Sequence, residues 1–325
     1  MRVVVSVDME GASQLRGVRE IFACFPDYWA TGRPALEADV VAACEGLLAG
    51  GASELILLDN HGGNTVNFAP ELLPPGARTE TWNVYDLPEH GIDAMFQVGY
   101  HARGGLNGFL SHTYVCDLRL RANGELISES HGRAWSAQVP LLGITGNDVH
   151  LETLGSLAGT PVLVVQQSHG HGAMTPVYED PAEGVEAIRS FAQACARQAA
   201  ERPAVVAPTD VLFEASMPHG AEVVEAMTEA GWTQSGEVEF SFDASEWSET
   251  RDPLAAAVNA ALVPYLPIWL GAFPDAEAAA SSKQEDVDAA GVVFDAWASS
   301  PRPEWFTAPG EPLPPGAREH FARHC

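Results

Sequence analysis

The sequence has little lysine, no paired cysteine motif and no long apolar run. Lys283 is the only lysine among 325 residues. The five cysteines are scattered, odd in number and without C-x-x-C spacing, which argues against a disulfide framework or a thiolate zinc site and favours a reducing cytoplasm. No run of about 18 apolar residues is present, and no basic, cleavable leader precedes the first apolar segment. We therefore expect a cytoplasmic protein without a membrane span.

The charge is strongly of one sign. The formal net charge is −27, with a pI near 4.5. Such a surface repels nucleic acid and anionic membranes, so we expect neither as a partner. With 46% hydrophobic residues, the chain is long enough to bury a sizeable core.

The first residues combine an apolar strand pattern with two acids. The β-branched run Val3–Val7 is followed directly by Asp8 and Glu10. The run is short and bounded by polar residues, which predicts a buried strand. Two carboxylates at the end of a strand repel each other unless a proton or a cation lies between them. This stretch is therefore a candidate metal site.

The order of apolar segments predicts an α/β protein. Pro34–Leu48 has helical spacing and lies between two short apolar runs, Val3–Val7 and Glu54–Asp59, which predicts a parallel β-α-β unit with a right-handed crossover. We expect a Rossmann-like, mostly parallel sheet with helices on both faces, plus a smaller α+β lobe. Further expected elements are a loop over Gly11–Arg33, strands at Ala94–Gly99, Ser111–Leu120, Val139–Ile144 and Pro161–Val165, a turn at Asn123-Gly124, and helices at Asn147–Leu157 and Pro181–Glu201.

Three regions are expected along the chain. Residues 1–202 form the metal-binding catalytic α/β region, and a joint at Pro203–Pro208 leads into a smaller α+β lobe over 203–270. Residues 271–325 form an acidic and proline-rich C-terminal extension. The elements expected in these last two regions are strands at Val211–Glu214 and Glu237–Phe242 and helices at Gly220–Ala230, Pro253–Leu266 and Gln284–Trp297.

Residues of ligand type follow three predicted strands. The first strand is followed by Asp8 and Glu10, the second ends at Asp59 with His61 just beyond, and the third is followed by His101. Ligands bind beyond the carboxyl ends of strands in open α/β sheets, and parallel neighbours bring these ends together. Acids and imidazoles suit zinc or a similar divalent ion. A further acid, Glu129, would allow two metals that share a carboxylate.

Each residue also has an ordinary structural explanation. Asp8 could cap a turn, Glu10 could be a solvated acid, and His61 could be a turn residue before two glycines. His101 could be a buried, hydrogen-bonded imidazole. The joint placement of these residues favours the metal site over separate structural roles. For His169 and His171 in Q-S-H-G-H-G-A, a loop or substrate-pocket role ranks ahead of metal binding.

Four motifs in this order resemble the DppA family of zinc-dependent D-aminopeptidases. They are S-V-D-M-E-G at 6–11, D-N-H at 59–61, G-Y-H-A-R at 99–103 and S-H at 111–112, and the resemblance extends to about Leu266. It implies an enzyme that removes N-terminal D-residues, notably D-alanine, from short peptides. It also implies a homo-oligomer, commonly a decameric ring.

The resemblance also implies the site. It implies two zinc ions per chain bridged by one aspartate, with one carboxylate and one histidine completing each metal. The ligands implied are Asp8 as the bridge, Glu10 and His61 for one metal, and His101 and Glu129 for the other. The catalytic histidine implied is His112, as a nucleophile; an imidazole there could equally serve as a general base.

The sequence departs from the family pattern in three places. D-N-H-G-G lacks the serine that often precedes the histidine, S-E-S-H-G-R-A replaces G-E-x-G-x-N-A around Glu129, and the chain continues past about residue 271. Two other functions therefore stay open. One is a metal-dependent amidase or peptidase of different small-peptide specificity, and the other is a non-catalytic peptide-binding protein.

Overall fold

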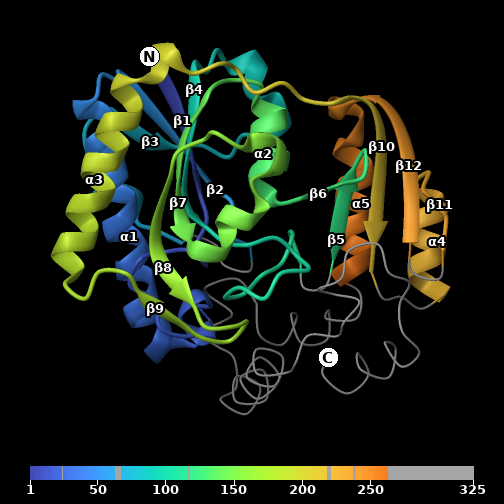
Figure 1. Cartoon of the computed structure of the whole chain (residues 1–325), viewed down its shortest axis with the longest axis horizontal. Helices are drawn as coiled ribbons and strands as arrows, with labels where there is room; N and C mark the ends of the chain where they lie inside the picture. The colour runs from blue at the N-terminus through green and yellow to red at the C-terminus, as the bar shows by residue number, and fades with distance from the viewer. Residues whose placement is uncertain (24, 63–66, 116–117, 218–220, 237–238, 263–325) are drawn as a thin grey trace.

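The computed structural model describes residues 1–262 except 24, 63–66, 116–117, 218–220 and 237–238. Two sheets organise these residues, a seven-stranded one and a five-stranded one (Figure 1). In the part of the chain that the structure describes, every helix is too short or too polar to cross a bilayer.

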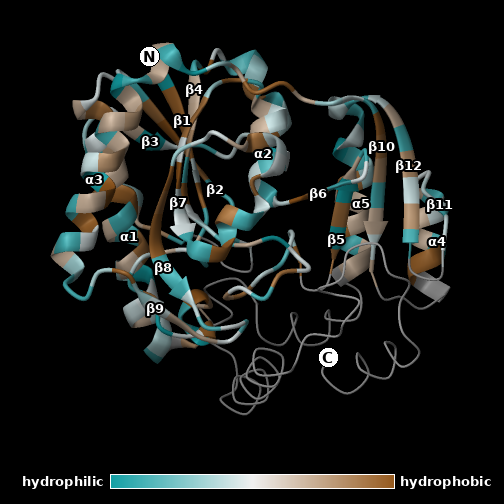
Figure 2. Cartoon of the chain, viewed as in Figure 1, coloured by the Kyte–Doolittle hydropathy of each residue, from teal (hydrophilic) through white to brown (hydrophobic). Residues whose placement is uncertain are grey.

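The larger sheet is mostly parallel, as predicted. Its strand order is β3-β2-β1-β4-β7-β8-β9, and only the β8–β9 pair is antiparallel. Its strands are β1 (Arg2–Val7), β2 (Glu54–Asp59), β3 (Ala77–Thr79), β4 (Ala94–Tyr100), β7 (Leu141–Asn147), β8 (Val162–Ser168) and β9 (Met174–Pro176). The central strands are apolar along nearly their whole length because helices cover both faces. In Figure 2, β8 is hydrophobic until its polar carboxyl end.

Alternate residues of β1 face two different helical layers. Val3, Val5 and Val7 are buried against α1 (Pro26–Ala49) and α3 (Pro181–Arg197). Val4 points the other way, into a cluster with α2 (Glu129–Ala137) and the 3₁₀-helix η3 (Val84–His90). Figure 1 shows α1 and α3 on one side of the sheet and α2 on the other. Helices on both faces confirm the predicted fold class.

The smaller sheet is antiparallel throughout, in the order β11-β12-β10-β5-β6. Side chains alternate along β10, with Val211, Phe213 and Ala215 buried against helices α4 and α5. Figure 2 accordingly shows mixed hydropathy along β12. The elements are β5 (Arg119–Ala122), β6 (Glu125–Ile127), β10 (Thr209–Ser216), α4 (Ala221–Glu229), β11 (Thr233–Gln234), β12 (Glu239–Glu246) and α5 (Arg251–Leu262).

The lobe expected over 203–270 is completed by strands from earlier in the chain. Two of its strands, β5 and β6, come from residues 119–127, within the region expected over 1–202. The division of the chain at residues 202 and 270 stays a prediction. The C-terminal extension over 271–325 and its expected helix at Gln284–Trp297 lie outside the described residues.

Several local predictions are confirmed and three are wrong. Strands β2 and β4 and the β5–β6 turn at Asn123-Gly124 lie where expected. The helix expected at Pro34 begins at Pro26, because proline is tolerated in the first helical turn and Pro34 is accommodated inside the helix. Ser111–Leu120 is not a continuous strand, because Tyr114 takes a left-handed conformation at φ +64°.

The remaining differences concern helices. The helix expected over Asn147–Leu157 is two 3₁₀-helices, η4 (Asp148–Thr153) and η5 (Gly155–Leu157). Helix α2 had no predicted counterpart, because its sequence E-S-H-G-R-A-W-S-A has too few apolar residues to show a helical pattern.

Gly99 allows the loop after β1 to lie against β4. It has a φ of +75°, and a Cβ there would lie 2.2 Å from the carbonyl oxygen of Asp8. The Asp8 N–H donates to the Val98 carbonyl (2.8 Å), and the Gly11 N–H donates to the Gly99 carbonyl (2.8 Å). A side chain at position 99 would therefore displace the backbone that carries Asp8.

Candidate metal centre

The carboxyl ends of three adjacent strands form the centre. Strand β1 lies between β2 and β4, so the residues that follow the three strands converge. Asp8 and Glu10 follow β1, His61 follows β2, and His101 follows β4. All four side chains are buried. The structure thus brings together the residues that the sequence placed at strand ends.

Asp8 lies between the two histidines. Its Oδ1 is 3.6 Å from His61 Nδ1, and its Oδ2 is 3.4 Å from His101 Nε2. Two groups of three residues therefore share this one carboxylate. In each group, ligand-type atoms lie within 4.8 Å of one another; the groups are Asp8, Glu10 and His61, and Asp8, His101 and Glu129.

Glu129 reaches the centre from the first turn of α2. The backbone N–H of Tyr114 donates to its Oε1 (2.7 Å), and the same oxygen lies 3.7 Å from His101 Nε2. Glu129 is buried like the other acids. Tyr114 itself has a left-handed backbone conformation, with φ +64°.

Backbone carbonyls fix the tautomers of the two imidazoles. His61 Nε2 lies 3.0 Å from the Ile21 carbonyl, and His101 Nδ1 lies 2.9 Å from the Ala102 carbonyl. A carbonyl only accepts, so these nitrogens carry the hydrogens. In the neutral rings, the other nitrogens direct lone pairs at carboxylate oxygens. That arrangement is repulsive unless a proton or a metal ion lies between them, so these donors fit a metal.

The pKa values have the same electrostatic origin. Burial alone would raise the pKa of Asp8, but the imidazoles of His101 and His61 hold it well below its usual value. Burial alone would lower the pKa of His61 and of His101, yet the neighbouring carboxylates raise both well above the usual range. The centre therefore attracts positive charge at the two nitrogens that face Asp8. His101 Nε2 has no hydrogen-bond partner among the described residues, as expected of a metal ligand.

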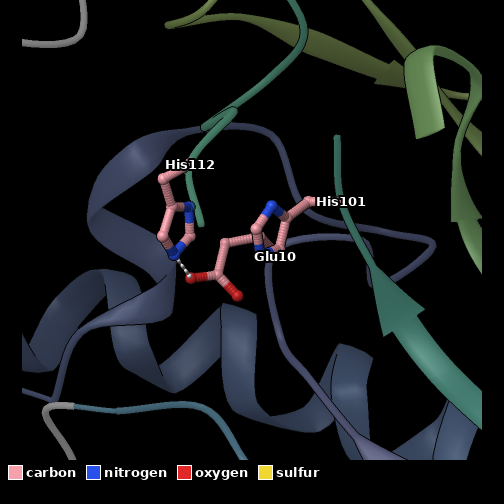
Figure 3. Close-up of side chains that lie close together, drawn as sticks. All are labelled: Glu10, His101 and His112. Carbon is pink, nitrogen blue, oxygen red and sulfur yellow. Dashed lines mark ion pairs between the residues drawn. The ribbon is translucent and has the colours of Figure 1, made fainter. Parts of the chain in front are cut away.

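His112 lies beside this centre, with one ring nitrogen anchored. Its Nδ1 donates to the Leu110 carbonyl (2.6 Å), so its Nε2 carries the lone pair. That Nε2 lies 3.7 Å from Glu10 Oε1 and 3.8 Å from Glu129 Oε1. Figure 3 shows the Glu10 carboxylate directed toward His112, with His101 alongside. Burial, followed by the charge of His101, lowers the pKa of His112, which favours an unprotonated ring.

Two supporting residues were not found from the sequence. Gln166, at the end of β8, donates its Nε2 hydrogens to the carbonyls of Glu10 (2.9 Å) and Ala12. The sequence feature that could have indicated this role is the pair of polar residues, Gln166 and Gln167, that follows the apolar part of β8. His150 is buried and neutral, since burial lowers its pKa to about 4, and its Nδ1 donates to the His101 carbonyl (2.6 Å). Nothing in the sequence around His150 indicated this role.

Asp59 and His171 support the centre from outside it. The Asp59 carboxylate accepts from the Asn67 backbone (2.9 Å) and side chain (2.8 Å), and Asn67 Nδ2 also donates to the His61 carbonyl (3.0 Å). The His171 carbonyl accepts from the Leu110 N–H (2.9 Å), which braces the turn before His112. His169 is exposed, with its Nε2 2.9 Å from Thr175 Oγ1.

Comparisons with known proteins identify a family and a similar fold. The family model of the D-aminopeptidases, Peptidase_M55, matches residues 1–253. A solved structure described as the Zn-dependent D-aminopeptidase DppA from Bacillus subtilis, a self-compartmentalizing protease, is similar in fold, with a TM-score of 0.70 and 20% sequence identity. The likeness covers 81% of this chain and 98% of that one. No curated protein sequence matches the chain.

Proposed function

The chain belongs to the D-aminopeptidase family, and on this premise we propose that it is a zinc-dependent aminopeptidase that removes D-alanine from the amino end of short peptides. We propose two zinc ions per chain. The observation that carries the proposal is the position of Asp8, whose two carboxylate oxygens face different histidines at 3.6 Å and 3.4 Å. A carboxylate shared in this way suits a bridge between two metal ions.

The ligand assignment follows the two groups around Asp8. Glu10 and His61 would complete one metal, and His101 and Glu129 would complete the other. The tautomers support this assignment, because each ligand histidine donates one N–H to a backbone carbonyl and directs its other nitrogen at the acids. When bound, two zinc ions would supply Lewis-acid polarisation of the scissile carbonyl and coordination of the free amino group.

His112 is the proposed catalytic residue. Its Nε2 accepts a proton from the attacking water while the new C–O bond forms. The protonated imidazole then gives that proton to the leaving amine nitrogen as the C–N bond breaks. The hydrogen bond to the Leu110 carbonyl supports this role, because it holds the ring and stabilises the imidazolium. Direct attack by Nε2 is distinguishable, since hydroxylamine would then trap an acyl-imidazole on His112.

We also propose a homo-oligomer in the form of a decameric ring. The support is the fold-level likeness to a protein described as a self-compartmentalizing protease. Light scattering coupled to size-exclusion chromatography of the purified chain measures this directly, and a monomeric mass would refute it. The proposed compartment is the cytoplasm, in line with the buried free thiols of Cys44 and Cys195.

Metal analysis and a peptide panel test the function. We expect close to two zinc equivalents per chain and cleavage of D-Ala-D-Ala that stops in a chelator and returns with zinc. Full activity in chelator, without a bound transition metal, would refute the metal site. Equal or faster cleavage of L-Ala-L-Ala would instead support a metal-dependent peptidase of different specificity.

A further inference from the structure

Within the residues that the structure describes, Arg133 is a cation without an anionic partner, on the helix that carries Glu129. Its guanidinium makes no hydrogen bond or ion pair within the residues that the structure describes, and its Nε is shielded from solvent. By contrast, the surface arginines Arg2 and Arg189 each form ion pairs with glutamates. A guanidinium whose hydrogen-bond donors stay free beside a binding site can bind an anionic ligand.

The position of Arg133 on α2 directs it toward the centre. It lies four residues after Glu129, so the two side chains share one face of the helix. Helical side chains lean toward the amino end of their helix, which here means toward Glu129. Burial alone would lower the pKa of Arg133, yet Tyr114, Tyr100 and the carboxylates of Glu129 and Asp8 raise it. The guanidinium is therefore within the electrostatic field of the acids without pairing with them.

Tyr114 holds the arginine in place. The guanidinium carbon lies 5.6 Å from the centroid of the Tyr114 ring, a cation–π contact. The tyrosine is itself fixed, since its N–H donates to Glu129 and its hydroxyl lies against Gly132, where a Cβ would be 2.2 Å away. Stacking positions the guanidinium but leaves its N–H donors free for a ligand.

Arg133 is also reachable from solvent. Every other residue of α2 is buried, whereas Arg133 is partly exposed. A ligand can therefore approach its N–H groups from the side that solvent reaches. Arginine suits a carboxylate in particular, because its planar fork donates two parallel hydrogen bonds.

We propose that Arg133 binds the C-terminal carboxylate of a short peptide whose amino end lies at the metal centre, and so makes the enzyme prefer substrates with a free carboxyl terminus. This inference rests on the proposed function of the same centre.

The test compares D-Ala-D-Ala with its C-terminal amide on the full-chain holoenzyme. The variants are Arg133→Met, which keeps the apolar stem against Tyr114, and Arg133→Lys, which keeps the charge but not the planar fork. The matched control is Arg251→Met, which removes a surface arginine paired with Asp86 (2.9 Å). Metal content and circular dichroism show that each variant is folded.

We expect the native enzyme to favour the carboxylate over the amide by at least about tenfold in KM, the change associated with one charge-assisted hydrogen bond. The ratio of the KM for the amide to the KM for the carboxylate falls toward one in Arg133→Met. The ratio is partly kept in Arg133→Lys and fully kept in Arg251→Met. If Arg133→Met does not fold, the reduced preference of Arg133→Lys decides the question. A full preference in either folded Arg133 variant, or none in the native enzyme, overturns the proposal.

Two further experiments are included. The first distinguishes a C-terminal carboxylate from a side-chain carboxylate, and the second tests the role of Arg133 separately from the proposed function. The α-amide of D-Ala-D-Asp keeps a side-chain carboxylate only, and binding like that of D-Ala-D-Ala would overturn the C-terminal assignment. Calorimetry with the uncleavable reduced-amide isosteres of D-Ala-D-Ala and its amide measures recognition without turnover. Discrimination between the isosteres in an enzyme that cleaves no D-peptide refutes the proposed function alone. Cleavage without discrimination refutes the role of Arg133 alone.

Discussion

The imidazole rings of His101 and His112 stack face to face, with centroids 4.1 Å apart and planes inclined by 4°. Each ring is anchored through its Nδ1 to a backbone carbonyl, His101 to Ala102 and His112 to Leu110. Both therefore present Nε2 to the carboxylates. The stack places a proposed metal ligand and a proposed proton carrier side by side, and their separate roles can be tested by substitution.

Replacing His112 by alanine should remove turnover without removing metal. We expect kcat to fall at least tenfold, a barrier increase of about 1.4 kcal/mol or more, because no other described imidazole has its free nitrogen in this position. Zinc content should stay near that of the native chain, as measured by plasma emission spectrometry. His169→Ala is the control, since it removes an exposed imidazole. Activity within tenfold of native would show that His112 is not the catalytic group.

The two acids that follow β1 should differ in their effect on metal content. Asp8→Asn should reduce bound zinc toward zero, because this carboxylate belongs to both ligand groups. Glu10→Gln should leave about one zinc equivalent per chain, because Glu10 belongs to only one of the two ligand groups that contain Asp8. Both replacements keep the shape of the side chain. Equal metal loss in the two variants would contradict the bridging role of Asp8.

Gly99→Ala should be far more damaging than the same change at Gly124. Both glycines have positive φ, +75° and +80°, so both variants carry the cost of a left-handed alanine, about 1–2 kcal/mol. Only at Gly99 would the new Cβ lie 2.2 Å from the Asp8 carbonyl oxygen, whereas at Gly124 nothing lies within 4 Å. We expect Gly99→Ala to lose at least about 2 kcal/mol more in urea unfolding, together with bound zinc.

Similar losses of stability in these two glycine variants would show that the backbone at Asp8 relaxes without cost. Zinc content separates the two effects further, since Gly124 lies in the β5–β6 hairpin turn and its variant should keep both metals.

Asp39 should make stability fall as pH rises. Burial raises the pKa of Asp39 to about 7, although both the backbone and the hydroxyl of Ser13 donate to it. The folded state therefore holds a proton that the unfolded state releases near pH 4. This contribution is complete below about pH 4 and is lost as pH rises through about 7, an upper limit of about 4 kcal/mol.

Asp39→Asn tests this because its amide can pair with Ser13 without ionising. Urea unfolding of both proteins in chelator at several pH values isolates the difference. We expect the native chain to lose stability relative to the variant between pH 4 and 8. A difference that does not change with pH would refute the buried, protonated carboxyl.

The sequence predicted best those residues of the centre that follow adjacent strands of the larger sheet. Asp8, Glu10, His61 and His101 follow apolar runs that had to be neighbours in a parallel sheet, so their proximity follows from topology. Glu129 was singled out only as a further acid, and its place in one ligand group, like the catalytic role of His112, came with the family resemblance. Between them the chain leaves for the smaller sheet and returns, and no local pattern indicates where a chain returns.

The supporting residues were missed for a related reason. The roles of His150 and Gln166 depend on contacts with His101 and Glu10, which are far away in the sequence. The role proposed for Arg133 depends on the lack of an anionic partner among the described residues. The periodicity of the sequence indicates neither property. The alternation over Ser111–Leu120 was misleading, because polar and apolar residues also alternate over 111–115, which form no strand. Tyr114 there has φ +64°, which only the folded surroundings enforce.

The excursion of β5 and β6 into the smaller sheet also has a consequence for biosynthesis. Every proposed ligand has left the ribosome soon after residue 129, yet the partner of β5 is β10, which begins at Thr209. Until β10 emerges, the hairpin between His112 and Glu129 has an unpaired edge. The β5–β6 hairpin therefore lacks this partner during the synthesis of some 80 further residues, and we expect the half of the centre that contains Glu129 to form after the half made by Asp8, Glu10 and His61.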